Sequence, residues 1–343
     1  MKKWLALFIA SMLMISLTAC GGTTKTEEAT SEPEKNNDSK ELKDVSIMLD
    51  WYPNALHTFL YVAKEKGYFE EEGINIDIQY PANPTDPLNL AAAGKITLGL
   101  YYQPDVIIAR ANENIPVKSV ASIVRSPLNR IVFLDKSPIQ SPKDLEGKKV
   151  GYPGIALNES LLQTMVTKDG GDPDKVELID VGFDLGTSIV TESVDAVIGA
   201  FINHEVPVLK QKGYETRNFN PVKYGVPAYS EIVLVTSDDT WANEKEEIQA
   251  FWRAAKKGYD FTKENPEKAL QILLDNQDEA NFPLDAEVEK ESLQILLTMM
   301  ETDQEEFGSQ TKEPWQEVTD WLVSTGLVSK KPNLDDMFIN ITK

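Results

Sequence analysis

The stretch that decides the fold is residues 45–67, VSIMLDWYPNALHTFLYVAKEKG. Residues 45–49 form a short β-rich run, and residues 56–66 space their apolar side chains along one face of a helix. Gly67 is a typical helix stop. A strand that leads through a short turn into a helix is the repeating unit of α/β folds. The segment therefore predicts an α/β protein with a strand-to-helix turn at residues 50–55.

The same alternation of strands and helices recurs along the rest of the chain. It predicts parallel sheets with helices on their faces. The long helical region from 240 to about 326 is expected to wrap the first part of the fold. Further strand-like runs lie at 74–78, 96–100, 117–124, 176–181, 194–199 and 231–235, and helical runs at 85–93, 104–110, 158–168, 244–263 and 287–301.

We expect the strands and helices to form two α/β lobes rather than one. Residues 44–135 and 236–343 would make up lobe 1, and residues 136–235 would make up lobe 2. The chain would cross between the lobes near 130–140 and near 225–238, and the two crossings would act as a hinge. Because ligands of open α/β sheets bind beyond the carboxyl ends of the strands, the two lobes would face each other across one cleft.

The N-terminal residues have the pattern of a secretory signal peptide. In residues 1–20, two lysines precede an apolar stretch that ends in small residues before Cys20, the only cysteine in the chain. Cys20 follows Leu-Thr-Ala and so resembles the lipobox of bacterial lipoproteins, in which the cysteine is acylated. Residues 21–43 are polar and predict a flexible tether. We expect a lipid-anchored protein on the extracytoplasmic face of the cell membrane; a plain secreted protein is the alternative.

The composition argues against several classes of function. The 343 residues carry a formal net charge of −21, which disfavours binding to nucleic acid. The two histidines, His57 and His204, do not form a zinc-binding spacing, and no second cysteine is present. Neither a phosphate-binding P-loop nor a Gly-x-Ser-x-Gly motif occurs. We therefore expect no metal, no cofactor and no catalytic residues.

Two turns of lobe 1 offer candidate ligand contacts. In the turn after residue 49, Trp51 provides an aromatic face, and Asn54 and His57 provide hydrogen-bond donors and acceptors. Asn54 can also cap the following helix, a role compatible with ligand contact. For His57, a structural role is the equal alternative. At the next strand-to-helix junction, Tyr102 and Gln103 are candidates. Because neighbouring strand residues face opposite ways, we expect only one of the adjacent tyrosines to face the cleft, and we choose Tyr102.

The matching turn of lobe 2 follows residue 150. Its glycines would let backbone N–H groups approach a ligand, and the start of the next helix adds partial positive charge. A plain turn would have the same pattern. The candidates for ligand contact in this turn are Tyr152, Pro153, Gly154, Asn158 and Glu159.

A second lobe 2 candidate follows the strand at 194–199. Asn203 and Glu205 would point into the cleft from there. The Glu205 carboxylate could accept charge-assisted hydrogen bonds from amino or ring N–H donors of a ligand. It could equally be a solvated residue at the start of a helix.

Five segments of the sequence carry a family resemblance: LDWYPNALHTFLYVAKEKGYFEEEGI, YYQPDVIIARANENIPVKSVASIVRSPLN, SPKDLEGKKVGYPG, VDAVIGAFINHE and YGVPAYSEIVLVTSDD. Together they resemble the NMT1/pyrimidine-precursor family of solute-binding proteins. The resemblance covers nearly the whole expected fold. The resemblance implies a type II periplasmic-binding-protein fold with a two-crossover hinge. It also implies that the cleft is lined by Trp51, Asn54 and Tyr102 on one side and by Tyr152–Gly154, Asn158, Asn203 and Glu205 on the other.

The family resemblance also implies a function. The protein would be a monomeric receptor of an ABC transporter, with a permease and its ATPase as partners. It would bind a small pyrimidine, N-formyl-4-amino-5-aminomethyl-2-methylpyrimidine, for thiamin salvage. Aromatic side chains would stack on the ring, and Glu205 would accept a hydrogen bond from the amino group.

Two other functions remain open at this stage. The same fold family includes pyrimidine synthases that consume their own histidine and bound pyridoxal phosphate, and His57 lies in the similar helix start. Those enzymes carry a Cys-rich motif that this chain lacks, so we expect no enzymatic activity. Sulfonate, nitrate or taurine receptors are the nearer alternative. They bind anions, which a cleft carboxylate such as Glu205 would repel.

Overall fold

The computed structural model describes residues 42–342. The predicted signal peptide, Cys20 and nearly all of the predicted tether lie outside this range, and the first strand begins at Lys43. Between residues 42 and 342, no helix has both the length and the apolar character that a membrane crossing needs.

The first lobe is built on a five-stranded sheet with the strand order β2-β1-β3-β10-β4. Strands β1, β2 and β3 are parallel, whereas β10 runs antiparallel to both β3 and β4. The parallel strands follow from the strand–helix alternation of the sequence. Each helix carries the chain back to the end of the sheet at which the previous strand began, so the next strand runs in the same direction. The strands are β1 (Lys43–Met48), β2 (Ile74–Gln79), β3 (Leu98–Tyr101), β4 (Val117–Val124) and β10 (Ile232–Ser237).

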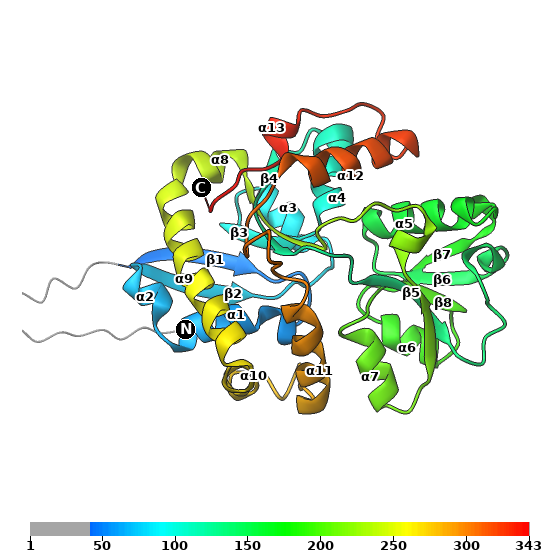
Figure 1. The fold of residues 1–343 in the computed structure, drawn as a ribbon, viewed down its shortest axis with the longest axis horizontal. Coiled ribbons are helices and arrows are strands. Elements are labelled where there is room, and N and C mark those ends of the chain that lie inside the picture. The colour runs from blue at the N-terminus through cyan, green and yellow to red at the C-terminus, as the bar shows by residue number, and fades with distance from the viewer. Residues whose placement is uncertain (1–41, 343) are drawn as a thin grey trace, which may run out of the picture. The chain divides into compact units, whose positions relative to one another are not determined.

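Helices from both ends of the described chain belong to this lobe (Figure 1). The N-terminal ones are η1 (Ala55–His57), α1 (Thr58–Glu65), α2 (Tyr68–Glu71), α3 (Asp86–Ala92), α4 (Gln103–Ile108) and the short π-helical turn η2 (Ala109–Glu113). The C-terminal ones are α8 (Asp238–Asn243), α9 (Lys245–Glu264), α10 (Pro266–Asp275), α11 (Ala286–Leu297), α12 (Lys312–Ser324) and α13 (Leu334–Met337).

The second lobe is a separate five-stranded sheet with the order β7-β6-β8-β5-β9. Its strands are β5 (Asn129–Leu134), β6 (Lys149–Tyr152), β7 (Glu177–Asp180), β8 (Ala196–Phe201) and β9 (Thr216–Phe219). Its helices, in green in Figure 1, are η3 (Pro142–Leu145), α5 (Ala156–Lys168), η4 (Pro173–Lys175), α6 (Leu185–Val190), α7 (Glu205–Gln211) and η5 (Pro221–Tyr224).

Both sheets are mixed, which corrects the expectation of parallel sheets. The antiparallel members are β5 and β10, the first strands that the chain forms after each crossing between lobes. Each of these two strands is reached directly from the other lobe. It therefore runs opposite to the strands that are reached through a helix of the same lobe. β5 pairs with β8 and β9 in the second sheet. The first crossing therefore spans 125–128, upstream of the expected boundary at 135.

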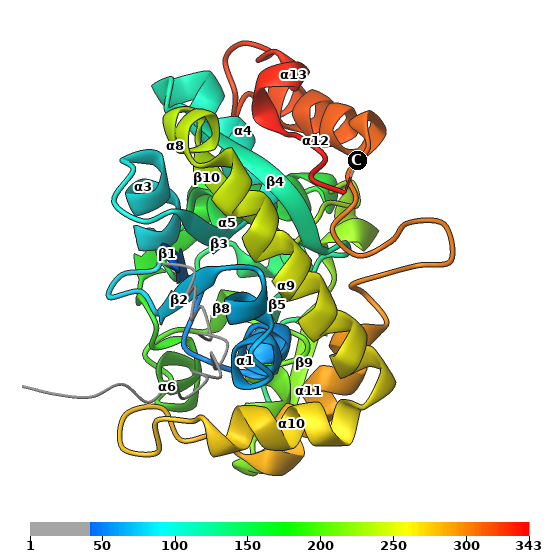
Figure 2. The ribbon, with the colours of Figure 1, turned by 90° about the vertical axis from the view of Figure 1, so that its left-hand side faces the viewer.

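The long helix α9 packs across α1, as Figure 2 shows. The apolar face of α9 includes Phe251 and Tyr259, both buried. At Gly258 the two helices approach so closely that an added Cβ would lie 2.1 Å from the backbone oxygen of Phe59. α11 does more than wrap the first lobe, because it contacts η1 and also α7 of the second lobe.

Hydrogen bonds of buried side chains join the two crossings to each other. Glu231, in the second crossing, accepts hydrogen bonds from the backbone N–H groups of Leu128 (2.6 Å) and Asn129 (2.9 Å) and from the Tyr229 hydroxyl (3.1 Å). Burial raises the pKa of Glu231 to about 7, although these donors oppose the rise. The Glu231 carboxylate thus joins the two crossing segments that form the hinge.

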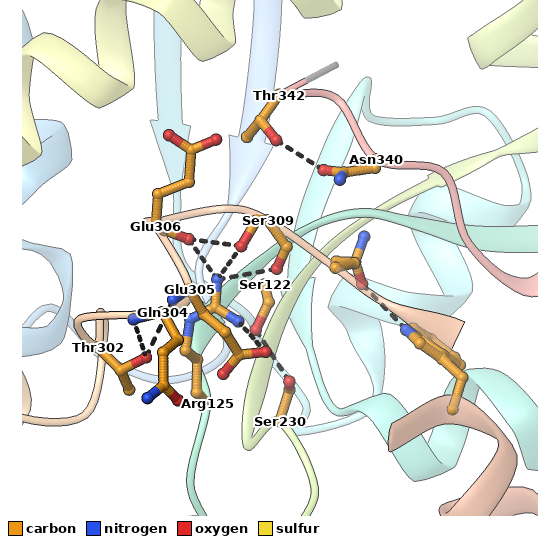
Figure 3. A network of polar contacts seen from close by, with 12 residues as sticks. Ser122, Arg125, Ser230, Thr302, Gln304, Glu305, Glu306, Ser309, Asn340 and Thr342 are labelled. Atoms are coloured by element: carbon orange, nitrogen blue, oxygen red, sulfur yellow. Dashed lines mark hydrogen bonds and ion pairs between the residues drawn. The ribbon is translucent and has the colours of Figure 1, made fainter. Parts of the chain in front are cut away.

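A second polar network lies at the start of the first crossing (Figure 3). The Arg125 guanidinium donates to the backbone oxygens of Glu306 and Ser309 and to the Ser309 hydroxyl. The hydroxyls of Ser122 and Ser230 are 2.9 Å apart and link β4 to the second crossing. The loop between α11 and α12 is therefore fastened to the base of the hinge.

Candidate ligand-binding cleft

A narrow cavity lies where the two lobes meet. We call it the slot. The walls of the slot lie close together. Among its residues are predicted contacts from both lobes, namely Trp51, Asn54, Tyr102, Pro153, Asn158 and Glu205. The other lining residues were not among the predicted contacts; they are Asp50, Leu56, Asn129, Ile155, Leu157, Gly199, Phe201 and His204.

The turn between β1 and η1 forms the lobe 1 wall, and its own hydrogen bonds hold it in shape. The Asn54 side chain accepts from the backbone N–H of Leu56 and donates to the backbone oxygen of Tyr52. Asn54 therefore caps η1 and lines the slot at the same time, the two roles that the sequence analysis left compatible.

His57 lies behind this turn and does not line the slot. Its ring is fully buried, its Nδ1 accepts from the backbone N–H of Asn54 (3.1 Å), and its Nε2 is 2.9 Å from a carboxylate oxygen of Asp50. Since Nδ1 accepts a hydrogen bond, the ring hydrogen on Nε2 donates to Asp50. His57 thus orients Asp50, which reaches the slot.

Tyr102 follows β3 and lines the slot, with its ring edge-on to Phe201 of the other lobe at 6.4 Å between centroids. Burial raises the pKa of its hydroxyl well above 10, so the hydroxyl remains a donor. Gln103 lies outside the slot and contacts the hinge instead: its side-chain oxygen accepts from the backbone N–H of Ser230 (2.8 Å).

The lobe 2 wall comes partly from the turn between β6 and α5. Asn158 lines the slot, and its side-chain oxygen accepts a hydrogen bond of 2.7 Å from Asn129. The side-chain oxygen of Asn129 in turn accepts from the backbone N–H of Gly199 (3.0 Å). Asn129 reaches this position because β5 pairs with β8 in a register that sets Asn129 opposite Phe201.

Four predicted lobe 2 residues lie outside the slot lining. Gly154 adopts a positive φ of 73°, and an added Cβ there would lie 2.9 Å from the Asp180 carboxylate, so its role is to make the turn. Asn203 is buried and donates to the Ser292 hydroxyl of α11 at 3.0 Å. Tyr152 and Glu159 are likewise absent from the slot lining.

Glu205 and His204 form an ion pair at the edge of the slot. One carboxylate oxygen of Glu205 accepts from the backbone N–H of Phe201 (2.7 Å), and the other is 2.9 Å from Nδ1 of His204. Burial alone would lower the pKa of His204, but the neighbouring Glu205 carboxylate raises it to about 9. Burial likewise opposes the charge on Glu205, yet its pKa is lowered by His204 and by the Phe201 N–H. At neutral pH the slot therefore presents a carboxylate and an imidazolium.

Aromatic rings from both lobes meet at Trp51, beside the slot. The ring centroid of Phe183, from lobe 2, lies 4.5 Å from those of both Trp51 and Tyr52. Tyr52 also stacks on Phe282, which follows α10, with centroids 4.3 Å apart. Edge-to-face and stacked aromatic rings attract each other, so the cluster holds the two lobes together beside the slot.

A buried polar contact joins the lobes on another side. The Asp105 carboxylate of α4 accepts from the backbone N–H of Leu157 at the start of α5 (3.1 Å). Burial raises the pKa of Asp105 to about 8, against the lowering effect of this hydrogen bond. Leu157 lines the slot, so this contact fixes the turn that forms the lobe 2 wall.

The chemistry of the slot follows from its lining. Trp51, Tyr102 and Phe201 offer aromatic faces, and Asp50 and Glu205 offer acceptors. Among the described residues that line it, none is lysine or arginine. No group of three or more metal-binding side chains occurs within the described residues. Such a lining suits a flat molecule that carries amino or ring N–H donors.

The two-lobed fold is shared with solved solute-binding proteins. The alkanesulfonate-binding protein SsuA from Xanthomonas axonopodis pv. citri, solved bound to MOPS, aligns with a TM-score of 0.67 at 15% identity, over 88% of this chain and 99% of that one. The ligand-binding component of an ABC-type import system from Staphylococcus aureus aligns with a TM-score of 0.66 at 14% identity, over 87% of this chain and 97% of that one. The chain therefore has the fold of a type II periplasmic binding protein.

The chain belongs to the family described as NMT1/THI5 like, which matches residues 54–269. The formylaminopyrimidine-binding protein of Halalkalibacterium halodurans is 55% identical over 306 residues, which are 89% of this chain and 92% of that protein. A 4-amino-5-hydroxymethyl-2-methylpyrimidine phosphate synthase of Legionella pneumophila is 27% identical over 78% of this chain and 85% of its own length. Relatives of this chain thus include a binding protein and, at lower identity, a synthase.

Proposed function

We propose that this protein is the solute-binding lipoprotein of an ABC importer and that its ligand is N-formyl-4-amino-5-aminomethyl-2-methylpyrimidine. The importer would supply this pyrimidine for thiamin salvage. The observation that carries the proposal is a narrow slot, lined by aromatic rings and carboxylates, in a chain 55% identical to a formylaminopyrimidine-binding protein. The protein would act as a monomer, closing its lobes on the ligand and then presenting it to a permease and its ATPase.

The slot residues take the following roles in the proposal. Trp51 and Tyr102 contact the faces of the pyrimidine ring. Glu205 accepts a hydrogen bond from the 4-amino group while it keeps its bonds to Phe201 and His204, because each carboxylate oxygen has two lone pairs. Asn54 and Asn158 serve the ring nitrogens or the formamide.

Sulfonate binding is the nearest rival, because the fold neighbours include a receptor for alkanesulfonates. The carboxylates of Asp50 and Glu205 argue against it: both lie in the slot lining and would repel an anion, and the His204 imidazolium is already paired with Glu205. A synthase activity is the other rival. His57 argues against it, because its ring is fully buried and both ring nitrogens are hydrogen-bonded. The chain also has only one cysteine.

Calorimetry of the purified protein tests the ligand. We expect the formylaminopyrimidine to bind with a micromolar Kd or tighter, roughly −8 kcal/mol or better. An alkanesulfonate of similar size should give no heat of binding. Firm binding of the sulfonate without binding of the pyrimidine would reject the proposed ligand. For the synthase alternative, mass spectrometry after incubation with pyridoxal phosphate and iron should show His57 intact.

The lipid anchor is tested separately, because Cys20 lies outside the described residues. Cells fed a clickable palmitate analogue should label the protein, and the Cys20→Ser variant should remain unlabelled. Equal labelling of both would refute acylation at Cys20 and leave the ligand proposal untouched.

A further inference from the structure

A second cavity adjoins the slot, and the proposed function does not use it. It has a volume of about 380 Å³ and lies in lobe 2 between α6 and α7, with Trp51 and Tyr52 of lobe 1 on one side. We call it the vestibule. Slot and vestibule share Trp51, His204 and Glu205, so the ion pair and the indole ring stand between them.

The slot is more exposed at this junction than elsewhere in its lining. Nine of its fourteen lining residues are buried, among them Asn54, Tyr102 and Asn158. The five partly exposed ones are Trp51, Gly199, Phe201, His204 and Glu205, and three of these also line the vestibule. A ligand substituent that is too long for the slot would therefore leave it beside the His204–Glu205 pair.

Beyond this junction the vestibule is largely apolar. Phe183, Val190, Val208 and Leu209 form its walls, and each is buried or partly buried. The exposed side chains Thr187 and Lys212 lie on its outer side. Its volume lies within the range of small-molecule sites, and its walls suit an apolar group rather than an ion.

We propose that the vestibule is a subsite for the acyl group of the ligand, so that the protein binds 5-(acylaminomethyl)pyrimidines with acyl groups larger than formyl. The proposal rests on the proposed function, because the pyrimidine ring must occupy the slot. A formyl group stays within or near the slot. A butanoyl or benzoyl group passes Trp51 and the His204–Glu205 pair and contacts Phe183, Val208 and Leu209, where burial of apolar surface offsets the cost of ordering the chain.

A series of ligands tests the proposal by calorimetry on the purified protein. The series consists of the N-formyl, N-acetyl, N-butanoyl and N-benzoyl derivatives of 4-amino-5-aminomethyl-2-methylpyrimidine. We expect the N-benzoyl compound to bind within tenfold of the N-formyl compound or more tightly. A loss of a hundredfold or more from formyl to benzoyl would overturn the vestibule proposal and leave the proposed function standing. If the N-formyl compound itself does not bind, the proposed function fails first.

A variant in the vestibule locates the acyl group. Gly186 lines the vestibule, its φ is not positive, and an added Cβ there meets no heavy atom within 4 Å. Gly186→Trp should weaken binding of the N-benzoyl compound at least tenfold and change N-formyl binding less than twofold. Gly186→Ala is the matched control and should leave both unchanged. Equal losses for both ligands in a folded Gly186→Trp protein would overturn the proposal, and Thr187→Trp repeats the test should Gly186→Trp fail to fold.

Discussion

The two histidines of this chain each pair with a carboxylate in a strand-to-helix turn, one pair in each lobe. In lobe 1, His57 is fully buried and bonds Asp50 at 2.9 Å. In lobe 2, His204 bonds Glu205 at the same distance, but 22% of the His204 side chain and 12% of the Glu205 side chain are exposed. The first pair shapes a wall, and the second pair faces the ligand site. The two pairs thus take different roles, because only the partly exposed pair has hydrogen-bonding groups that a ligand can reach.

The largest effect is expected when the buried pair is broken. His57→Ala leaves the Asp50 carboxylate buried without its donor and removes the acceptor for the Asn54 N–H. Removing one partner of a buried pair costs about 3–5 kcal/mol. Chemical denaturation should show a loss of this size in the free energy of unfolding. His204→Ala is the matched change in lobe 2 and should cost much less. Equal losses would contradict the different roles of the two pairs.

The next largest effect is expected on ligand affinity when the exposed pair is altered. Glu205→Gln keeps an acceptor for the Phe201 N–H but removes the charge. Since a hydrogen bond to a charged group contributes about 1.5–3 kcal/mol, we expect the Kd for the formylaminopyrimidine to rise about 10- to 100-fold, with little change in Tm. Glu159→Gln, on the neighbouring turn but outside the slot lining, is the control. An unchanged Kd for Glu205→Gln would remove Glu205 from the site.

A smaller effect should appear in the pH dependence of stability. The pKa of His204 is raised to about 9 in the folded protein from about 6.5 when unfolded, so its stabilising contribution is complete below pH 6.5 and is lost as the pH rises through 9. The free-energy difference between the parent protein and His204→Gln should shrink over this window, by on the order of 1 kcal/mol because solvent reaches the pair. A constant difference from pH 6 to 10 would show that folding does not raise the pKa of His204.

The smallest effect is expected at the aromatic cluster beside the slot. Phe183→Ala removes the contacts that the Phe183 ring makes with Trp51 and Tyr52 across the lobes. Aromatic contacts of this kind contribute about 0.5–1.5 kcal/mol in addition to the free energy of burying the apolar surface. Ligand dissociation, followed by Trp fluorescence in a stopped-flow instrument, should become about two- to tenfold faster. Phe133→Leu, in the core of lobe 2, serves as the control for general loosening. A dissociation rate unchanged by Phe183→Ala would show that the cluster does not hold the closed lobes.

The strand–turn–helix units could be predicted from the sequence because their signals are local. The run at 117–124 coincides with β4, and the helix expected at 244–263 differs from α9 by one residue at each end. Apolar spacing within one element reflects the period of that element, so neighbouring residues carry the information. The direction of β5 and β10 carries no such signal, since it depends on which lobe the chain has just left.

The sequence by itself determined that Trp51, Tyr102, Asn158 and Glu205 stand at strand-to-helix turns, where α/β folds place their ligand sites. Only the tertiary structure decided which side chains at those turns reach the slot. His57 and Asn203 form hydrogen bonds with Asp50 and with Ser292 of α11, whereas His204 and Asn129 line the slot. The physical reason is that a side chain's direction into a cleft is set by partners that lie far away in the chain, through strand register and interlobe contacts that no local pattern encodes.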